Sequence, residues 1–447
     1  MTEAVATYPE GSSQAPRVSF FTLGCRLNQY DTAALRARLV EAGFREAPPG
    51  SGEGELILVN TCTVTRRADQ EARQLIRKLH REHPGSRIVV TGCYAQRAPE
   101  ELRAVPGVAA ILGAMEREDP ETLLRAAGGE ALVRVGSGRA ARPFATAAPL
   151  HVGRSRALLK IQDGCDSFCA YCVVPYVRGR SRSLPLPEAV ERTRRLLETG
   201  FREIVLTGAD LGDYGRDRGE EHALPRLVEA ILALGSGHRV RLSSIEPHKL
   251  DPELVTKIGT EPRLCRHLHL PLQSGSDRIL GAMRRGYTRE EYGSLLGRIT
   301  ARGPVGIGAD IIVGFPGEGE AEFQETLRFL EEAPVTFLHV FRYSSRPGTA
   351  AARSPGTPPD PVVRDRAERL RALGEAKALA FRRSFLGTTL PVVMERGVGR
   401  RGRVAMSDVY VPVEVERQTD VPPCVFGVRV HDEEGDRLVG SPVAHAG

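Results

Sequence analysis

The sequence has no long apolar run and no recognisable targeting segment. None of its hydrophobic stretches approaches the roughly 20 apolar residues that a membrane-spanning helix needs. The first residues do not combine a basic segment with an apolar one, as a secretion signal does. These absences argue against a membrane protein and predict a cytoplasmic one. In that reducing compartment the eight cysteines are expected to be metal ligands or free thiols rather than disulfides.

Lysine is also rare, because only five of the 62 basic residues are Lys. Arginine suits phosphate binding through its planar fork. The codon usage of a GC-rich genome explains the same ratio equally well, and a net charge of +6 is modest for 447 residues. Composition alone therefore gives only a weak indication of nucleic-acid binding.

The chain is too long for one ordinary domain, and at 41% hydrophobic residues it is too apolar to be disordered. Its patterns predict an α/β protein in three parts. These are a parallel α/β domain over residues 16–130, a partial barrel of six βα units over residues 151–384, and a small C-terminal β-barrel over residues 386–447.

Cys165, Cys169 and Cys172 form a C-x3-C-x2-C motif, the most informative feature of the chain. Three thiolates at this spacing fill three iron sites of a 4Fe-4S cluster and leave one iron open to a small molecule. A structural zinc site is the alternative, but it normally has four ligands, and no fourth Cys or His lies near in sequence. Tyr171, just before the last cysteine, resembles the radical S-adenosylmethionine signature, in which this ring lies near the adenine of the cofactor.

Three further cysteines follow three predicted strands of the N-terminal part. Residues 17–23, 55–59 and 87–91 read as buried strands, and Cys25, Cys62 and Cys93 lie two or three residues beyond them, each at a predicted helix start. Parallel strands bring these positions to one sheet edge. Each cysteine alone could be a buried structural residue. Together, at helix N-termini that lower thiol pKa, they predict a second 4Fe-4S cluster with three protein ligands.

The central part carries six strand patterns after a stretch, residues 120–155, that reads as a connection. The strands lie near residues 156–161, 203–207, 239–243, 267–270, 307–313 and 337–341. Six βα units in about 190 residues are too few for an eight-stranded barrel, so an incomplete barrel is predicted.

Polar and glycine residues follow these strands, where a βα barrel places its chemistry. Each group also fits an ordinary turn or helix cap. Gly208 and Gly314 would let the backbone approach a cofactor, and Asp210 or Glu246 could bind its amino or ribose groups. Gln273 and Ser274 complete the predicted rim.

The C-terminal part begins with a basic helical pattern over residues 361–386, with a net charge of +4. This helix is either a solvated face or a phosphate-tracking surface. Short alternating runs at residues 390–394, 409–415 and 425–430 then predict the small β-barrel. Residues 386–447 contain seven Arg against nine Asp plus Glu, and the basic residues of this part gather at Arg396, Arg400, Arg401 and Arg403.

The chain resembles the radical S-adenosylmethionine methylthiotransferases across nearly its whole length. The matching segments are residues 22–29, 60–65, 91–96, 163–172 and 269–276. Residues 160–165, 179–183 and 243–247 are most similar to the members that act on threonylcarbamoyladenosine of tRNA. The C-terminal barrel resembles the TRAM domain, an RNA-contacting module.

This resemblance implies two 4Fe-4S clusters, with Cys25, Cys62 and Cys93 on the auxiliary one and the C-x3-C-x2-C cysteines on the radical one. It implies two S-adenosylmethionine molecules per turnover, one giving the methyl group and one the radical. The implied reaction places a methylthio group on C2 of N6-threonylcarbamoyladenosine at position 37 of tRNA, in the anticodon stem-loop. The electron donor is expected to be a flavodoxin or ferredoxin, and the sulfur donor is open.

Two alternatives remain. The first is methylthiolation of isopentenyladenosine in tRNA or of an aspartate in a ribosomal protein. The second is a non-catalytic iron-sulfur protein that senses redox state or binds RNA, a role that leaves the polar rim without a purpose.

Overall fold

The chain folds into two units in this computed structural model, which describes residues 15–48, 50–137, 144, 149, 156–398, 402–416 and 424–443. Unit 1 is drawn from Met1–Val152, Asp163–Arg182 and Ser344–Thr349. Unit 2 is drawn from Gly153–Gln162, Ser183–Tyr343 and Ala350–Gly447. No helix among the described residues is both long and apolar enough to cross a membrane.

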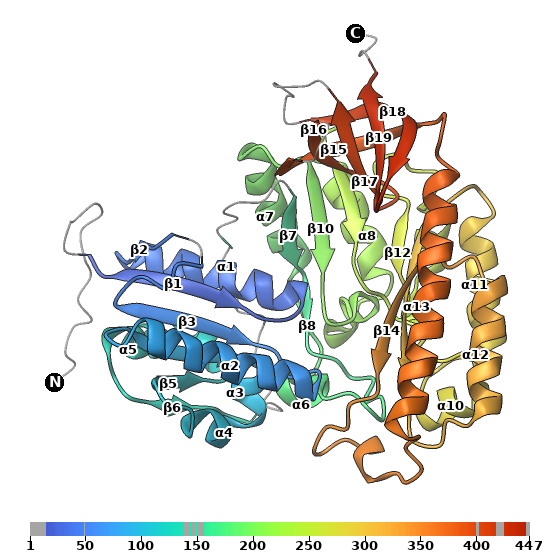
Figure 1. Ribbon diagram of the computed structural model, residues 1–447. Coiled ribbons are helices and arrows are strands. Elements are labelled where there is room, and N and C mark those ends of the chain that lie inside the picture. Colours follow the sequence, from blue (N-terminus) through green and yellow to red (C-terminus); the bar gives the residue numbers. More distant parts are fainter. Residues whose placement is uncertain are drawn as a thin grey trace. The chain divides into compact units, whose positions relative to one another are not determined.

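A six-stranded sheet in the order β2-β1-β3-β4-β5-β6 forms the framework of unit 1, and every neighbouring pair is parallel (Figure 1). Its strands are β1 (Arg17–Thr22), β2 (Arg45–Glu46), β3 (Leu56–Thr61), β4 (Arg87–Gly92), β5 (Val108–Leu112) and β6 (Val133–Arg134). Its helices are α1 (Arg26–Glu41), α2 (Arg66–Glu82), α3 (Cys93–Arg97), α4 (Pro99–Arg103), η1 (Glu116–Glu118), α5 (Pro120–Gly128) and α6 (Val174–Val177).

Strand β3 shows why both faces of this sheet are covered. All six of its residues are buried, and successive side chains alternate between the faces. Leu56 and Leu58 join a core with residues of α1 and α5, whereas Ile57 and Val59 join a core with residues of α2 and α4. The near-continuous apolar run is therefore the expected pattern of a parallel strand between two helical layers.

The prediction of a plain connection over residues 120–155 is wrong for its first part. Helix α5 begins at Pro120 behind an Asp119 N-cap, and β6 pairs in parallel with β5. A strand of only two exposed residues has no periodicity to detect in the sequence. Most of residues 138–155 lie outside the described part of the chain.

Six parallel strands form the centre of unit 2, as predicted. They make two three-stranded sheets, β11-β10-β7 and β12-β13-β14, which isolated bridges at Val240–Leu264 and Ser244–His269 connect. The strands are β7 (Ala157–Lys160), β10 (Glu203–Thr207), β11 (Arg239–Leu242), β12 (His267–His269), β13 (Gly306–Val313) and β14 (Phe337–Arg342). The incomplete barrel is confirmed. Two short strands, β8 (Gln162–Asp163) and β9 (Arg182–Ser183), pair with each other.

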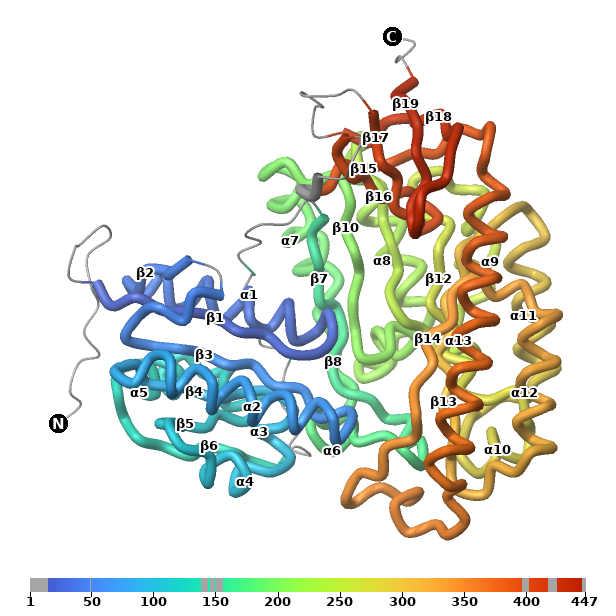
Figure 2. Tube along the Cα trace, in the orientation of Figure 1, coloured from blue at the N-terminus to red at the C-terminus, as the bar shows by residue number. Residues whose placement is uncertain are grey.

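Helices flank these strands, and α13 runs alongside β14 (Figure 2). The helices of unit 2 are α7 (Leu186–Glu198), η2 (Leu211–Asp213), η3 (Arg216–Arg218), α8 (Ala223–Leu232), η4 (Pro247–Lys249), α9 (Pro252–Lys257), α10 (Asp277–Ala282), α11 (Arg289–Thr300), α12 (Glu320–Glu332), η5 (Ala351–Arg353) and α13 (Asp360–Arg383).

The C-terminal strands close into a barrel in the order β15-β16-β17-β19-β18, which confirms the predicted architecture. They are β15 (Thr389–Val398), β16 (Gly402–Ser407), β17 (Pro412–Glu416), β18 (Val425–Glu434) and β19 (Arg437–Pro442). The predicted strand at residues 409–415 is wrong in its first half. Tyr410 has a φ of 66°, which interrupts an extended strand, and its backbone N–H donates to the Ser407 carbonyl in a turn.

Buried arginines attach this barrel to the amino-terminal ends of β10 and β11. The Arg239 guanidinium donates to the carbonyls of Pro391 (2.9 Å) and Met406 (2.8 Å). Arg241 donates to the carbonyls of Ser407 (2.7 Å) and Asp408 (3.0 Å). Because the barrel occupies the amino-terminal ends of these strands, their carboxyl ends, where a βα barrel carries its chemistry, lie at the other end.

Candidate iron-sulfur site

The three N-terminal cysteines follow three adjacent strands of unit 1. Cys25 is the N-cap of α1 after β1, Cys62 directly follows β3, and Cys93 is the first residue of α3 after β4. Cys25 is exposed, whereas Cys62 and Cys93 are buried. The structure thus places all three at the carboxyl edge of one parallel sheet. Cys62 differs from the expected helix start, since α2 begins four residues later.

These three thiols lie close enough to act on one another. Gly24, with φ at +97°, leaves no room for a side chain, because a Cβ there would lie 2.6 Å from the Cys62 Cβ and 3.0 Å from its Sγ. Burial raises the pKa of the Cys62 thiol to about 12, and Cys93 and Cys25 add to the rise. Burial also raises the pKa of Cys93. At Cys62 and Cys93, burial therefore opposes the lowering of the thiol pKa that a helix N-terminus was expected to give.

Cys165, Cys169 and Cys172 also belong to unit 1, on the loop that follows β8. All three are half-buried. The backbone N–H of Ser167 donates to the Cys165 sulfur (3.5 Å), and that of Val174 donates to the Cys172 sulfur (3.4 Å). Hydrogen bonds of this kind stabilise thiolate ligands and tune a bound cluster. Tyr171 lies on this loop and is half-buried.

The sulfur spacing distinguishes a cluster from a single metal ion. A tetrahedral zinc with bonds of about 2.3 Å holds its sulfurs about 3.8 Å apart. Among the described residues, neither set of three cysteines brings all of its sulfurs within 4.8 Å of one another. Neither set therefore has the sulfur spacing of one tetrahedral zinc site.

A buried charge network surrounds the cysteines of unit 1. Arg178, six residues beyond Cys172, donates to Asn28 Oδ1 (2.6 Å), Asp31 Oδ2 (3.0 Å) and Asp163 Oδ1 (2.9 Å). Its positive charge partly offsets the rise that burial gives to the pKa of Cys93. The sequence analysis missed Arg178, because nothing in a sequence rich in arginine marks one of them as buried.

A second buried arginine of unit 1 comes from far along the chain. Arg346 donates to Thr63 Oγ1 (2.8 Å) and to Asp69 Oδ2 (2.5 Å). Thr63 is the neighbour of Cys62, and Asp69 lies on α2. The short segment Ser344–Thr349 therefore supports the loop that carries Cys62.

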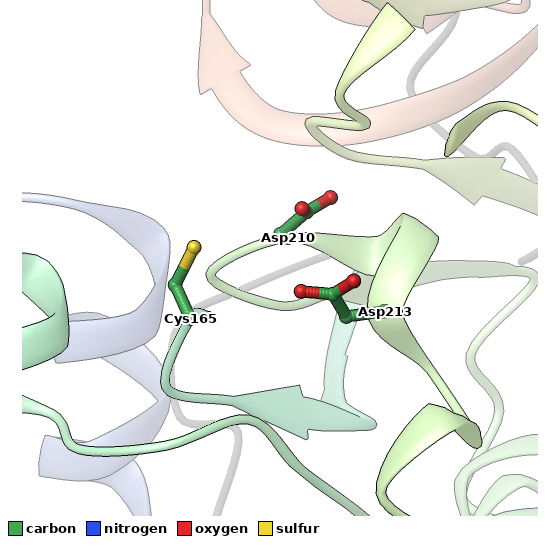
Figure 3. A group of neighbouring side chains, drawn as sticks. All are labelled: Cys165, Asp210 and Asp213. Carbon is green, nitrogen blue, oxygen red and sulfur yellow. The ribbon is translucent and has the colours of Figure 1, made fainter. Parts of the chain in front are cut away.

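The loops after β10 and β11 in unit 2 bring three charged residues together. Lys249 binds Asp210 Oδ2 (2.7 Å) and Asp213 Oδ1 (2.8 Å), and all three side chains are buried. Figure 3 labels the two aspartates, which come from the loop after β10 and from η2, and Cys165 of unit 1. Burial and Asp210 raise the pKa of Asp213. Lys249, one of only five lysines, could have been noticed in the sequence by its rarity.

Comparison with known proteins agrees with this arrangement. Residues 17–113 match the model of "Uncharacterized protein family UPF0004", and residues 159–330 match the radical SAM superfamily. The chain is 38% identical to the threonylcarbamoyladenosine tRNA methylthiotransferase MtaB of Aquifex aeolicus, over 82% of this chain and 89% of that protein. It is 37% identical to MtaB of Bacillus subtilis, over 92% and 93%. The chain belongs to the radical SAM methylthiotransferase family.

One further relative and one solved structure add to this placement. The tRNA-2-methylthio-N(6)-dimethylallyladenosine synthase of Novosphingobium aromaticivorans is 35% identical, over 86% of this chain and 88% of that protein. The radical S-adenosylmethionine methyltransferase TsrM of Kitasatospora setae, solved with cobalamin and a [4Fe-4S] cluster, is 16% identical. It aligns with a TM-score of 0.54 over 74% of this chain and 75% of that one, which supports the fold alone.

The remaining rim residues of this radical SAM methylthiotransferase have protein partners in the structure. Glu246 pairs with Arg285, yet burial raises its pKa. The Glu246 backbone N–H donates to Asp210 Oδ1 (3.3 Å), so the structure brings these two predicted residues together. The Ser274 hydroxyl lies 3.3 Å from that of Thr326, and Gln273 has a φ of 70°.

The two predicted glycines are confined by packing. A Cβ on Gly208 would lie 2.8 Å from Gln162 Oε1, and one on Gly314 would lie 2.6 Å from Val363 Cγ2. Gly314 also has a φ of +78°. Packing within unit 2 therefore explains why both positions are glycine. The close approach of their backbone to a cofactor stays a prediction.

Proposed function

We propose that this chain places a methylthio group on C2 of N6-threonylcarbamoyladenosine in the anticodon stem-loop of tRNA. The main support for this proposal is the sequence identity of 37–38% between this chain and two proteins named MtaB, over most of each chain. The location of all six candidate ligand cysteines in unit 1 supports it. The proposed division of the chain is an N-terminal domain over residues 16–130, a radical SAM core over 151–384 and a TRAM-like domain over 386–447.

In this proposal, Cys165, Cys169 and Cys172 hold the radical 4Fe-4S cluster, and Cys25, Cys62 and Cys93 hold the auxiliary one. When bound, these groups and S-adenosylmethionine supply one-electron cleavage of a sulfonium, hydrogen abstraction from carbon and a site for sulfur. The burial of Cys62 and Cys93 excludes water from two of the three proposed auxiliary ligands. A flavodoxin or ferredoxin is the proposed electron donor.

The chain's own rim residues would position S-adenosylmethionine. Asp210, Glu246, Gln273 and Ser274 are the proposed polar contacts, with Tyr171 near the adenine and Gly208 and Gly314 at close backbone approaches. Asp210 already accepts from Lys249 and from the Glu246 backbone, so part of its role is to hold the loops after β10 and β11 in place.

The test is anaerobic reconstitution with iron and sulfide, followed by reaction with dithionite, S-adenosylmethionine and an anticodon stem-loop carrying threonylcarbamoyladenosine. Mass spectrometry of the nucleosides should detect the 2-methylthio derivative. The triple variant Cys25→Ala, Cys62→Ala, Cys93→Ala should still cleave S-adenosylmethionine but form no methylthio product. A chain that releases no deoxyadenosine would instead be a non-catalytic iron-sulfur protein.

Isopentenyladenosine in tRNA is the second candidate substrate, because a relative named for dimethylallyladenosine is 35% identical. A stem-loop with that nucleoside, offered beside the threonylcarbamoyl one, separates the two. Exclusive methylthiolation of isopentenyladenosine would overturn the preferred substrate, and the reverse result would support it.

A further inference from the structure

Arg178 connects the two sets of cysteines within unit 1. It lies in the same chain segment as Cys172, at the C-cap of α6, and its backbone N–H donates to the Val174 carbonyl (2.8 Å). Its guanidinium donates to Asn28 and Asp31 of α1, the helix whose N-cap is Cys25. The Asn28 amide in turn donates to the carbonyls of Leu23 (2.8 Å) and Thr61 (3.0 Å), two residues before Cys25 and one before Cys62. One side chain therefore connects the C-x3-C-x2-C segment to the loops that carry Cys25 and Cys62.

The hydrophobic surroundings fix this placement. Val173, the N-cap of α6, and Val177, its last residue, form a buried cluster with Cys93. Arg178 itself is only 2% exposed. A side chain held by three carboxylate or amide oxygens in a dry environment has little freedom to move, so its positive charge is a permanent part of the site.

The neighbouring charges are balanced before any cluster is bound. Asp31 also accepts from Arg117, while Asp163 and Glu118 both lie within bonding distance of Arg182. Three arginines thus face three carboxylates, Asp31, Asp163 and Glu118. Thiolates at Cys25, Cys62 and Cys93 would add negative charge close to Arg178, which directly follows the Val177 that packs against Cys93.

We propose that Arg178 is a positioning residue that raises the reduction potential of the auxiliary cluster, by placing a fixed, buried positive charge beside the loops that carry its ligands. Reduction adds negative charge to a cluster, and a nearby cation favours that state. The proposal rests on the assignment of Cys25, Cys62 and Cys93 as cluster ligands.

The test isolates the auxiliary cluster in a chain with Cys165→Ala, Cys169→Ala and Cys172→Ala. After anaerobic reconstitution this parent should contain about four irons per chain. Its midpoint potential is measured by redox titration followed by electron paramagnetic resonance. Arg178→Gln, added to the parent, should shift the potential to a more negative value, and Arg178→Lys, which keeps the charge, should shift it less.

The control is Arg125→Gln, which removes an exposed arginine paired with Glu130 in the same unit and should leave the potential unchanged. An unchanged potential in Arg178→Gln would overturn the inference. If that variant does not retain iron, Arg178→Lys decides: a more negative potential supports the inference, and an unchanged one overturns it. A parent that takes up no iron would overturn the cluster assignment itself, and with it the role of Arg178.

Discussion

At the residue scale, the N-terminal cysteines depend on a glycine that only the folded structure explains. Gly24 precedes Cys25 in a motif that the family resemblance had already marked. The sequence could identify the cysteines by their spacing after strands. It could not show that the left-handed backbone of Gly24 lies against Cys62, because that contact joins two separate loops.

Gly24→Ala should lower both stability and iron retention. The new Cβ would overlap the Cys62 side chain, and an alanine at φ +97° is strained, so unfolding should become easier by about 1–3 kcal/mol. Urea denaturation and iron content of the reconstituted chain measure the two effects. Gly128→Ala in α5 is the control, since nothing lies within 4 Å of its Cβ position. Equal results for the two variants would contradict this explanation.

Lys249→Met should destabilise unit 2 strongly. It leaves Asp210 and Asp213 buried without their cation, and breaking a buried ion pair from one side costs about 3–5 kcal/mol. Thermal denaturation of the iron-free chain measures the loss. Lys257→Met, whose partners Glu229 and Glu253 are on the surface, should change stability by less than about 1 kcal/mol. Wild-type stability in Lys249→Met would show that the aspartates need no counter-charge.

At the scale of elements, the six strands of the core could be predicted because each is a short apolar run with a helix after it. Strands β16 and β19 were not predicted. A small barrel alternates inward and outward side chains over few residues, so each strand carries a weak pattern. The charged start of β11 was read correctly as a strand, but the role of Arg239 and Arg241 in holding another domain depends on tertiary contacts.

Glu203→Gln should destabilise the fold where the C-terminal barrel attaches to the core strands. Burial alone would raise the pKa of Glu203, but Arg241 and Arg239 outweigh it and hold that pKa well below its ordinary 4.5. The carboxylate therefore stabilises the fold fully above the ordinary pKa, and this contribution is lost as pH falls toward the folded pKa. We expect the variant to lose about 3–5 kcal/mol near pH 7. Denaturation at several pH values should show the difference shrinking below about pH 4.5.

Arg382→Gln should affect stability rather than RNA affinity. The helix expected to be either a solvated face or a phosphate-tracking surface has many of its arginines engaged within the chain. Arg366 binds Glu318, and Arg382 and Arg383 bind Glu433 of β18. Loss of the Arg382 bonds should cost about 1.5–3 kcal/mol. Stem-loop affinity measured at several salt concentrations should keep its slope, and a reduced slope would restore the phosphate-tracking interpretation. In the predicted basic group of Arg396, Arg400, Arg401 and Arg403, the middle two residues lie outside the described part of the chain.

At the scale of the whole molecule, the sequence predicted three consecutive domains, whereas unit 1 is assembled from three separate stretches. Arg178 binds Asn28 across 150 positions of sequence, and Arg346 binds Thr63 across 283. Periodicity and spacing report local structure, so contacts of this range were not predictable from one sequence. The family resemblance supplied the cysteine assignments, but not the side chains that support them.

A fragment ending at Val152 should therefore be much less stable than the same region in the full chain. It keeps the six-stranded sheet but lacks Arg178 and Arg346, which leaves Asp69 and Asp31 with fewer partners. Hydrogen exchange of β3 and β4 in the fragment and in the whole protein measures the difference. Equal protection would show that the two later stretches add nothing to the fold.

The origin of unit 1 in three stretches also has a consequence during synthesis. The loop after Cys62 lacks one of its buried partners until Arg346 has been synthesised and has left the ribosome. By then most of unit 2 has already emerged. The first proposed metal-binding region to be translated is thus among the last to be completed, so insertion of iron there is expected to follow, rather than accompany, growth of the nascent polypeptide.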